Sequence, residues 1–219
     1  SFKKIYVKDI SKDYHCEFGM VHAAELKKKK GVVVTNKGKE LFIFEPTFKD
    51  IYEKINRGPQ IVTSKDIGLI IANTGLNNSS TVVDSGSGSG ALCCMLANIA
   101  KKVISYELRE DFYEIVCKNK ALLKLDNLSV KNKDIYEGID EKEVDVITLD
   151  LPEPWKALIH AKDSLKVGGF LVNYSPTIPQ VADFVKESGK HDSLIHLNTV
   201  ELIQRGWDFD DRKIRPKTA

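Results

Sequence analysis

Hydrophobic positions follow two alternating spacings along the second part of the chain. Runs of strand length, rich in β-branched residues, occupy residues 81–84, 103–106, 128–131, 144–149 and 169–174. Apolar residues three or four positions apart predict helices over residues 91–100, 110–125, 154–166 and 178–188. Because strands alternate with helices, we expect right-handed crossovers and a doubly wound, Rossmann-like α/β domain. Ligands of such domains bind at the carboxyl ends of the strands.

The region before these elements has other patterns. Short β-branched or aromatic runs at residues 5–7, 31–35 and 41–44, separated by turn residues, predict a small β-rich domain over residues 1–58. Thr63 then offers a helix cap with Asp66 three positions later, and apolar residues recur at helical spacing until Gly75. Residues 59–219 form the second predicted domain.

The end of the chain lacks a helical pattern. Residues 193–203 alternate between apolar and polar side chains, which predicts an antiparallel edge strand. Such a strand needs a hairpin partner, and the residues that follow it do not supply one. We therefore expect the natural polypeptide to continue past Ala219.

Composition and charge narrow the class of protein. The 219 residues are 42% hydrophobic, and no stretch approaches the roughly 18 consecutive apolar residues that cross a bilayer. The four cysteines and five histidines lack metal-ligand spacing, so we expect no metal and a soluble protein of the cytoplasm. Residues 1–58 hold 13 Lys and Arg against 8 Asp and Glu, whereas the rest hold 20 against 23. The basic first domain favours a polyanionic partner.

The strongest local motif leads from the strand at residues 81–84 into the next helix. Its glycines, Gly86, Gly88 and Gly90, allow a tight turn and a close approach of the backbone to a ligand. Glu107 closes the next strand, 21 residues after Gly86, where a carboxylate can accept both hydroxyls of a ribose. A cofactor that contains a nucleoside is predicted.

The acids beside this loop indicate which cofactor it is. Gly86, Gly88 and Ala91 also satisfy the pattern of dinucleotide-binding loops. Asp84, however, places a carboxylate where it would repel a pyrophosphate and attract the ammonium or sulfonium of S-adenosyl-L-methionine. Asp134 follows the third strand, where it can bond an adenine amine. Together the acids favour S-adenosyl-L-methionine over NAD.

A second motif, Leu149-Asp150-Leu151-Pro152-Glu153-Pro154-Trp155, follows the fourth strand of the domain. Its two prolines disfavour both helix and sheet pairing, so we predict a rigid loop over the cofactor. Asp150 then lies where an acceptor amine would meet the methyl group.

These motifs resemble those of a known family. The glycine loop with Glu107, the Asp150 segment, residues 174–180 and Arg215-Pro216 are similar to the tRNA (adenine-N1)-methyltransferases in their archaeal form. The resemblance implies a class I methyltransferase fold and methylation of a T-loop adenine, in archaea sometimes also of the preceding adenine. It also implies S-adenosyl-L-methionine as donor, S-adenosyl-L-homocysteine as product, and a homotetramer.

The motifs and the resemblance together define the predicted site. We expect Asp150 to be the catalytic residue, accepting a hydrogen bond from the amine of a flipped adenine and stabilising the charge that grows on the ring. We expect Trp155, Tyr174 and Pro176 to wall the base pocket, and Arg205 and Arg215 to contact tRNA phosphates. The predicted donor-binding residues are Gln60, Asp84, Gly86, Gly88, Ser89, Gly90, Ala91, Leu92, Glu107, Asp134, Ile135 and Asp150.

Three other functions stay open on the sequence. A methyltransferase that acts on a small molecule or a protein would keep the glycine loop but would not need the basic domain or the Asp150 motif. An NAD-dependent Rossmann enzyme would also satisfy the glycine spacing. A non-catalytic RNA-binding subunit would be expected to have lost the glycine loop, which is intact here.

Overall fold

The structure, a computed structural model, describes residues 3–58, 61–210 and 212–217 of the chain. The chain folds into two compact units, Ser1–Ile55 and Asn56–Ala219, so their boundary lies close to the predicted one at residue 58. No helix among the described residues is long and apolar enough to cross a membrane.

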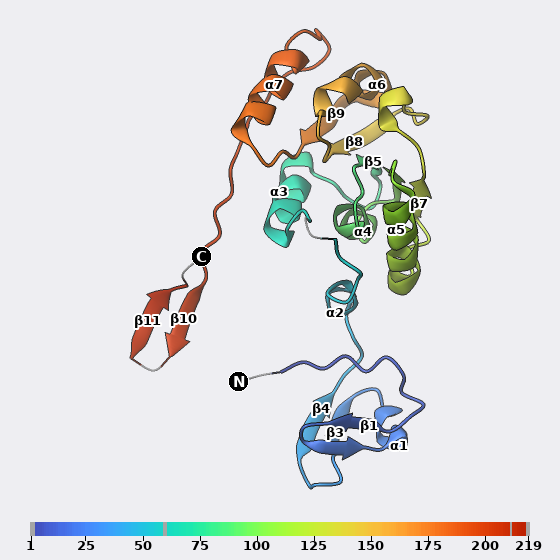
Figure 1. The fold of residues 1–219 in the computed structure, drawn as a ribbon, viewed down its shortest axis with the longest axis vertical. Coiled ribbons are helices and arrows are strands. Elements are labelled where there is room, and N and C mark those ends of the chain that lie inside the picture. The colour runs from blue at the N-terminus through green and yellow to red at the C-terminus, as the bar shows by residue number, and fades with distance from the viewer. Residues whose placement is uncertain (1–2, 59–60, 211, 218–219) are drawn as a thin grey trace. The chain divides into compact units, whose positions relative to one another are not determined.

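The second unit is built on a parallel sheet of five strands in the order β7-β6-β5-β8-β9 (Figure 1). The chain enters at the central strand β5, adds β6 and β7 on one side, and then crosses to add β8 and β9 on the other. The switch point lies at β5, where Ser85 is level with Tyr106 of β6 and Leu149 of β8. The strands span Thr81–Ser85 (β5), Lys102–Tyr106 (β6), Leu128–Lys131 (β7), Val144–Leu149 (β8) and Leu165–Asn173 (β9). The predicted doubly wound α/β fold is confirmed.

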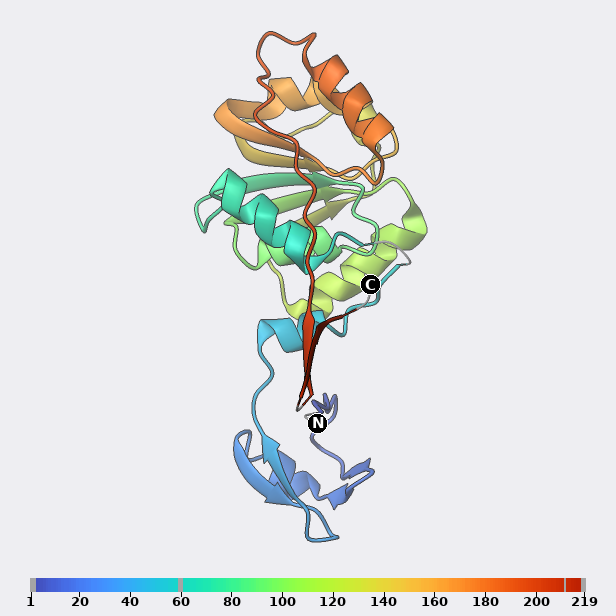
Figure 2. The same ribbon diagram turned by 90° about the vertical axis from the view of Figure 1, so that its left-hand side faces the viewer.

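Two groups of helices cover the two faces of this sheet (Figures 1 and 2). Val83, Ile104 and Ile147 form a buried cluster on the face toward the second group. The alternate residues Val82 and Val103 are also fully buried, because successive side chains of a strand point to opposite faces. The first group comprises α3 (Ser64–Thr74), α4 (Ala91–Ala97) and α5 (Glu110–Leu123). The second comprises the 3₁₀ turns η1 (Ile135–Glu137) and η2 (Pro154–Ala157), with α6 (Leu158–Ser164) and α7 (Ile178–Ser188).

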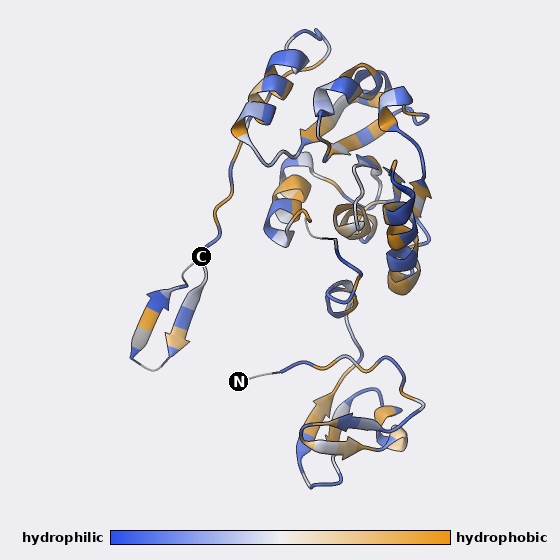
Figure 3. Ribbon diagram, in the orientation of Figure 1, coloured by the Kyte–Doolittle hydropathy of each residue, from blue (hydrophilic) through white to orange (hydrophobic). Residues whose placement is uncertain are grey.

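Hydropathy along the elements accounts for this layered packing. Figure 3 shows hydrophobic colouring along the sheet strands, whereas α5 alternates hydrophobic and hydrophilic residues. A parallel sheet buried on both faces needs continuously apolar strands, and a covering helix needs only one apolar side.

Two predictions overlap at Pro154, a loop through residue 155 and a helix from residue 154. The structure supports the helix, since η2 begins at Pro154. A proline at the first position of a helix loses no hydrogen bond, and its fixed φ suits the turn. The last sheet strand begins at Leu165 rather than at residue 169, so the helix before it is shorter than predicted.

The first unit consists of two antiparallel hairpins and two short helices. Its small core contains Val21, Leu26 and Val33. The strand predicted at residues 5–7 is wrong, because no neighbouring strand among the described residues pairs with this segment. The hairpins are β1 (Tyr14–Cys16) with β2 (Gly19–Val21) and β3 (Gly31–Val34) with β4 (Glu40–Ile43), and the helices are α1 (Ala23–Leu26) and α2 (Phe48–Tyr52).

The end of the chain also differs from the prediction. Residues 193–203 form no strand, and the side chains of Ile195, Leu197 and Ile203 are exposed. An alternating pattern makes a strand only where another strand accepts its backbone hydrogen bonds, and the described residues supply none here. A short hairpin follows, β10 (Trp207–Asp210) with β11 (Lys213–Pro216).

Asn119 of α5 joins the entry of the second unit to the glycine loop. Its side-chain oxygen accepts from the Asn56 N–H at 2.8 Å, and its amide donates to the carbonyls of Asn56 at 2.9 Å and Ser89 at 2.8 Å. The side chain is only 1% exposed, so water cannot replace these bonds.

We expect Asn119→Ala to lower the free energy of unfolding of the second unit by about 2–4 kcal/mol, because it leaves three backbone groups unpaired. Urea unfolding followed by tryptophan fluorescence measures this, since both tryptophans, Trp155 and Trp207, belong to this unit. Lys118→Ala, at an exposed neighbouring position, is the control and should change stability little.

Candidate active site

The two strongest sequence motifs meet where β5 and β8 end. The N–H of Asp150 donates to the carbonyl of Ser85 at 2.9 Å. Gly86 follows with φ of 79°, and a Cβ at this position would overlap the carbonyl oxygen of Asp150. Glycine is therefore required at residue 86 both by the backbone conformation and by the closeness of the Asp150 chain.

The rest of the glycine loop is held by its own packing. Gly90 starts α4 with φ of 81°, and a Cβ there would lie 2.9 Å from Val116. Gly88 has φ of 51°, and a Cβ there would lie 4.0 Å from the carbonyl oxygen of Gly86. Ala91 and Leu92 are buried in the first turn of α4, and their contact with a cofactor stays a prediction.

Glu107 lies against this loop at the end of β6. Its carboxylate accepts from the N–H of Gly88 at 2.8 Å and from the N–H of Arg109 at 2.9 Å, and the residue is 6% exposed. Asn132, which the sequence argument did not select, donates to the Glu107 carbonyl at 2.8 Å. The predicted ribose acceptor is thus fixed directly beside the predicted turn.

Asp134 and Ile135 lie in the loop that follows β7. Asp134 caps η1 by accepting from the N–H of Tyr136 at 2.8 Å, and Ile135 is buried. The hydroxyl of Tyr136, another residue that the sequence argument missed, accepts from the N–H of Glu153 at 3.3 Å. The loops after the third and fourth strands of the domain are therefore joined.

Asp84 lies beneath the loop rather than on its open side. It is 1% exposed, and its two oxygens accept from Ser105 at 2.5 Å and from Thr148 at 2.8 Å. Ser105 also shares a hydrogen bond of 2.5 Å with Ser87 of the loop. Direct contact between Asp84 and a cofactor stays a prediction, but its negative charge acts on the site from below.

The two carboxylates of this region are difficult to ionise. Burial, opposed by the Ser105 and Thr148 hydrogen bonds, raises the pKa of Asp84 to about 6. Burial, followed by the negative charge of Asp84, raises the pKa of Asp150 to about 6. A bound cation would relieve this cost by favouring both ionised forms.

Asp150 has no side-chain hydrogen bond or ion pair within the described parts of the chain. Its carboxylate is half-buried and is therefore available to accept from a ligand. Tyr174 lies close by: burial, and then the charges of Asp66 and Asp150, raise its pKa above the ordinary value of 10. The N–H of Tyr174 donates to Leu149, directly before Asp150, at 2.9 Å.

The Asp150 motif and the segment at residues 174–180 are also linked. Gln180 of α7, which the sequence argument did not assign to the site, donates to the carbonyl of Pro152 at 3.2 Å. Trp155 is half-buried in η2, and Pro176 is exposed before α7. Both lie in the joined segments, and their contact with a base stays a prediction.

Gln60 lies outside the described residues, so its place at the site stays a prediction. Two other predicted residues are not joined to the site. Arg205 and Arg215 are exposed in the last segment, and within residues 61–210 and 212–217 neither bonds to a site residue. The described residues also contain no group of acids, cysteines and histidines that could hold a metal ion.

The residues present fit S-adenosyl-L-methionine. A Cβ at Gly88 would make only an ordinary contact, 4.0 Å from the carbonyl oxygen of Gly86, and the buried hydroxyl of Ser89 has no hydrogen-bond partner within the described chain. Glu107 and Asp134 would hold the nucleoside, and the charges of Asp84 and Asp150 suit a cationic sulfur. These carboxylates would repel a pyrophosphate, and no lysine or arginine side chain among the described residues is bonded to the glycine loop to offset that repulsion.

Comparison with protein families agrees with this geometry. The model of the tRNA methyltransferase complex GCD14 subunit matches residues 41–218. A curated relative from Methanocaldococcus jannaschii, tRNA (adenine(57)-N(1)/adenine(58)-N(1))-methyltransferase TrmI, is 33% identical over 99% of this chain and 86% of its own length. The tRNA (adenine(58)-N(1))-methyltransferase TrmI of Thermus thermophilus is 32% identical over 81% of this chain and 71% of its own.

Solved structures of similar fold include two from thermophilic bacteria. A SAM-dependent O-methyltransferase from Thermotoga maritima superposes with a TM-score of 0.82 at 30% identity, covering 95% of this chain and 80% of its own. The tRNA (m1A58) methyltransferase TrmI of Aquifex aeolicus has a TM-score of 0.76 at 25% identity, covering 94% and 82%.

We expect Gly86→Ala to weaken binding of S-adenosyl-L-methionine by at least about tenfold, because the new methyl group displaces either the loop or Asp150. Isothermal titration calorimetry measures the change. Gly68→Ala is the matched control: Gly68 lies inside α3 with open space around its Cβ position, so binding should stay unchanged. If both variants bound S-adenosyl-L-methionine equally well, the requirement for glycine at residue 86 would be contradicted.

We expect the stability of the ligand-free protein to carry a pH dependence from Asp84. Because its folded pKa of about 6 exceeds the ordinary 3.8, its contribution is fully present below 3.8 and is lost as pH rises through 6. Asp84→Asn removes this dependence, so its stability relative to wild type should rise by roughly 1 kcal/mol between pH 5 and pH 7. Urea unfolding at each pH measures the difference, and Asp183→Asn on exposed α7 should leave the slope unchanged.

Proposed function

Because this chain belongs to the family of the tRNA methyltransferase complex GCD14 subunit, we propose that it is a tRNA (adenine-N1)-methyltransferase. It uses S-adenosyl-L-methionine and methylates N1 of an adenine in tRNA. The adenines that we propose as targets are those at positions 57 and 58, which the name of the Methanocaldococcus jannaschii relative gives for that enzyme.

The observation that carries this proposal is the position of the Asp150 carboxylate. It is half-buried, lacks a partner within the described chain, and is attached to the backbone on which Gly86 packs. An acceptor at this point can receive a hydrogen bond from the exocyclic amine of adenine. That bond orients the base so that N1, rather than the amine, faces the donor.

When bound, S-adenosyl-L-methionine supplies a methyl group that is transferred in line from sulfur to nitrogen. The protein needs little acid or base chemistry, since N1 of an unpaired adenine has a free lone pair. Asp150 stabilises the positive charge that develops on the ring, and its own burial strengthens this effect. Tyr174 and Trp155 offer aromatic faces on which the flipped base can stack.

We assign contact with tRNA phosphates to two basic parts of the chain. The first unit carries the excess of positive charge, and Arg205 and Arg215 lie exposed in the last segment. Such contacts release counterions, so binding should weaken steeply with salt. Residues 1–58 act in tRNA contact and assembly, and residues 59–219 act in catalysis.

A homotetramer is part of the same proposal. The last segment exposes apolar side chains that a neighbouring subunit can cover, among them Ile195, Ile203 and Phe209. Strand β9 is also an edge strand of its sheet, and Val167 on it is fully exposed.

Transfer of a labelled methyl group to an unmodified tRNA transcript tests the function. We expect 1-methyladenosine at position 58, or at 57 and 58, by nucleoside mass spectrometry and primer extension. Asp150→Ala should lower turnover by roughly 100-fold while calorimetry finds donor binding largely intact, because the carboxylate acts mainly on the acceptor. Asp183→Ala, on the exposed side of α7, is the charge-matched control.

Two results would contradict the proposal. One is label incorporation only into hydroxyl oxygens, as the O-methyltransferase description of the Thermotoga maritima neighbour would suggest for that protein. The other is unchanged turnover of Asp150→Ala on tRNA, which would remove Asp150 from the mechanism.

A further inference from the structure

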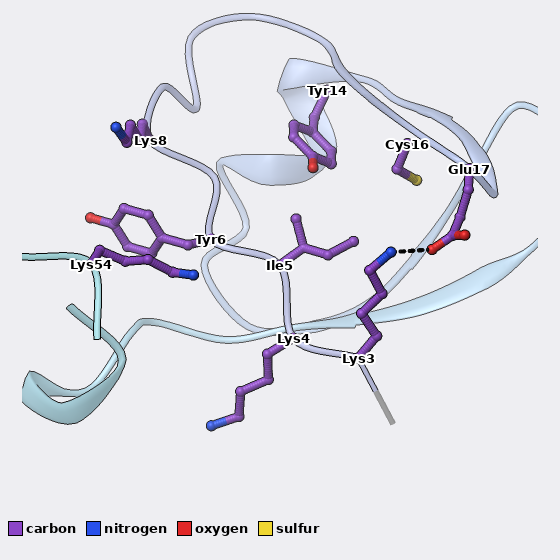
Figure 4. Close-up of a pocket in the computed structure, with 9 residues that line it drawn as sticks. All are labelled: Lys3, Lys4, Ile5, Tyr6, Lys8, Tyr14, Cys16, Glu17 and Lys54. Atoms are coloured by element: carbon purple, nitrogen blue, oxygen red, sulfur yellow. Dashed lines mark hydrogen bonds and ion pairs between the residues drawn. The ribbon is translucent and has the colours of Figure 1, made fainter. Parts of the chain in front are cut away.

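The first unit contains a cavity that the methyl-transfer site does not use (Figure 4). Its volume is about 520 Å³, within the usual range of about 300–1,000 Å³ for small-ligand sites. All of its lining belongs to Ser1–Ile55. The lining residues are Lys3, Lys4, Ile5, Tyr6, Lys8, Tyr14, Cys16, Glu17 and Lys54.

The charges of this cavity are only partly neutralised. Lys3 pairs with Glu17 at 2.7 Å, and Lys4 pairs with Asp50 at 2.8 Å. Lys8 and Lys54 make no side-chain hydrogen bond or ion pair among the residues described. Two ammonium groups are therefore free to bind an anion at one cavity.

The same cavity has aromatic walls. Tyr6 and Tyr14 are both half-buried, and Tyr14 packs on the core cluster of Val21, Leu26 and Val33, which holds it in place. Figure 4 shows Lys8, Tyr6 and Lys54 at one end of the cavity, with Cys16 and Glu17 at the other. A nucleotide matches this combination, because its base can stack on an aromatic side chain and its phosphate can bind the free lysines.

We propose that this cavity binds one unstacked nucleotide of the tRNA, separate from the adenine that is methylated. The base stacks on Tyr6, and Lys8 and Lys54 hold its phosphate. This inference rests on the proposed function, since it takes tRNA as the substrate. RNA is favoured over a phosphorylated protein because the cavity joins free cations to aromatic faces, within a unit of strongly positive charge.

Binding of unmodified tRNA to the full chain, measured by filter binding over a salt series, tests the two lysines. We expect Lys8→Ala/Lys54→Ala to bind about tenfold more weakly than wild type. The slope of log affinity against log salt should flatten by about 0.7, the value for losing contact with one phosphate of a single strand. Lys37→Ala/Lys39→Ala removes the same charge from exposed positions of the same unit, so a loss as large in this control would overturn the proposal.

The aromatic contact has its own pair of variants. Tyr6→Ala should weaken tRNA binding about tenfold, whereas Tyr6→Phe keeps the ring and should bind as wild type. Photo-crosslinking of tRNA that contains 4-thiouridine should yield a nucleotide on a peptide from residues 3–8, identified by mass spectrometry. Crosslinks confined to the second unit, or equal affinity of Tyr6→Ala and Tyr6→Phe, would overturn the proposal.

The two proposals fail in different ways. Calorimetry with S-adenosyl-L-methionine should give wild-type affinity for every variant of the first unit, because the donor residues lie in the second. If wild type binds tRNA through the cavity lysines but transfers no methyl group, the proposed function is wrong and the cavity assignment is supported. If wild type methylates tRNA and the cavity variants match their controls, only the cavity assignment is wrong.

Discussion

The structure of the second unit depends on the close packing of the Gly86 backbone against the carbonyl of Asp150. A parallel sheet brings the ends of β5 and β8 to the same level, but it does not decide how near the following loops approach. The absence of a side chain at Gly86 decides that, and the bond from the Asp150 N–H to Ser85 fixes it. The glycine loop and the Asp150 carboxylate are thereby held in a fixed position relative to each other.

The electrostatics of this site explain why a bound cation would stabilise it. Asp84 and Asp150 are held close together in a poorly solvated place, and each resists ionisation for that reason. The hydroxyls of Ser105 and Thr148 offset part of the cost for Asp84, whereas Asp150 lacks such help among the described residues. Because ionised Asp150 is poorly solvated, a hydrogen bond from an acceptor amine would stabilise it more than the same bond would in water.

Sequence reasoning succeeded where a residue's role follows from its neighbours in the chain. The strands at residues 128–131 and 144–149 and the helix at 178–188 have the predicted bounds, because the spacing of their apolar residues is a local pattern. It failed at residues 5–7 and 193–203, where strand formation depends on a partner that no local pattern reveals.

The site residues also divide into those set by local sequence and those that depend on distant segments. The glycines and Glu107 could be recognised by spacing, since a βα turn fixes their distance along the chain. Ser105, Tyr136 and Gln180 could not, because their hydrogen bonds join segments at least 17 residues apart in the sequence. The burial of Asp84 was equally hidden, since the strand pattern places it near the carboxyl end of its strand but does not show what covers it.

The positive charge of the first unit and the carboxylates of the second suit different parts of the RNA. Carboxylates that attract a sulfonium also repel the phosphates on either side of a target base, so the site favours entry of the base alone. Screening confines this repulsion to about 8 Å at physiological salt, roughly one nucleotide from the reacting ring. The affinity for the polyanion must therefore come from positive groups elsewhere, and the proposed function assigns it to the excess of lysine in the first unit. A chain with the same catalytic unit and a neutral first unit would keep its donor site and lose its hold on RNA.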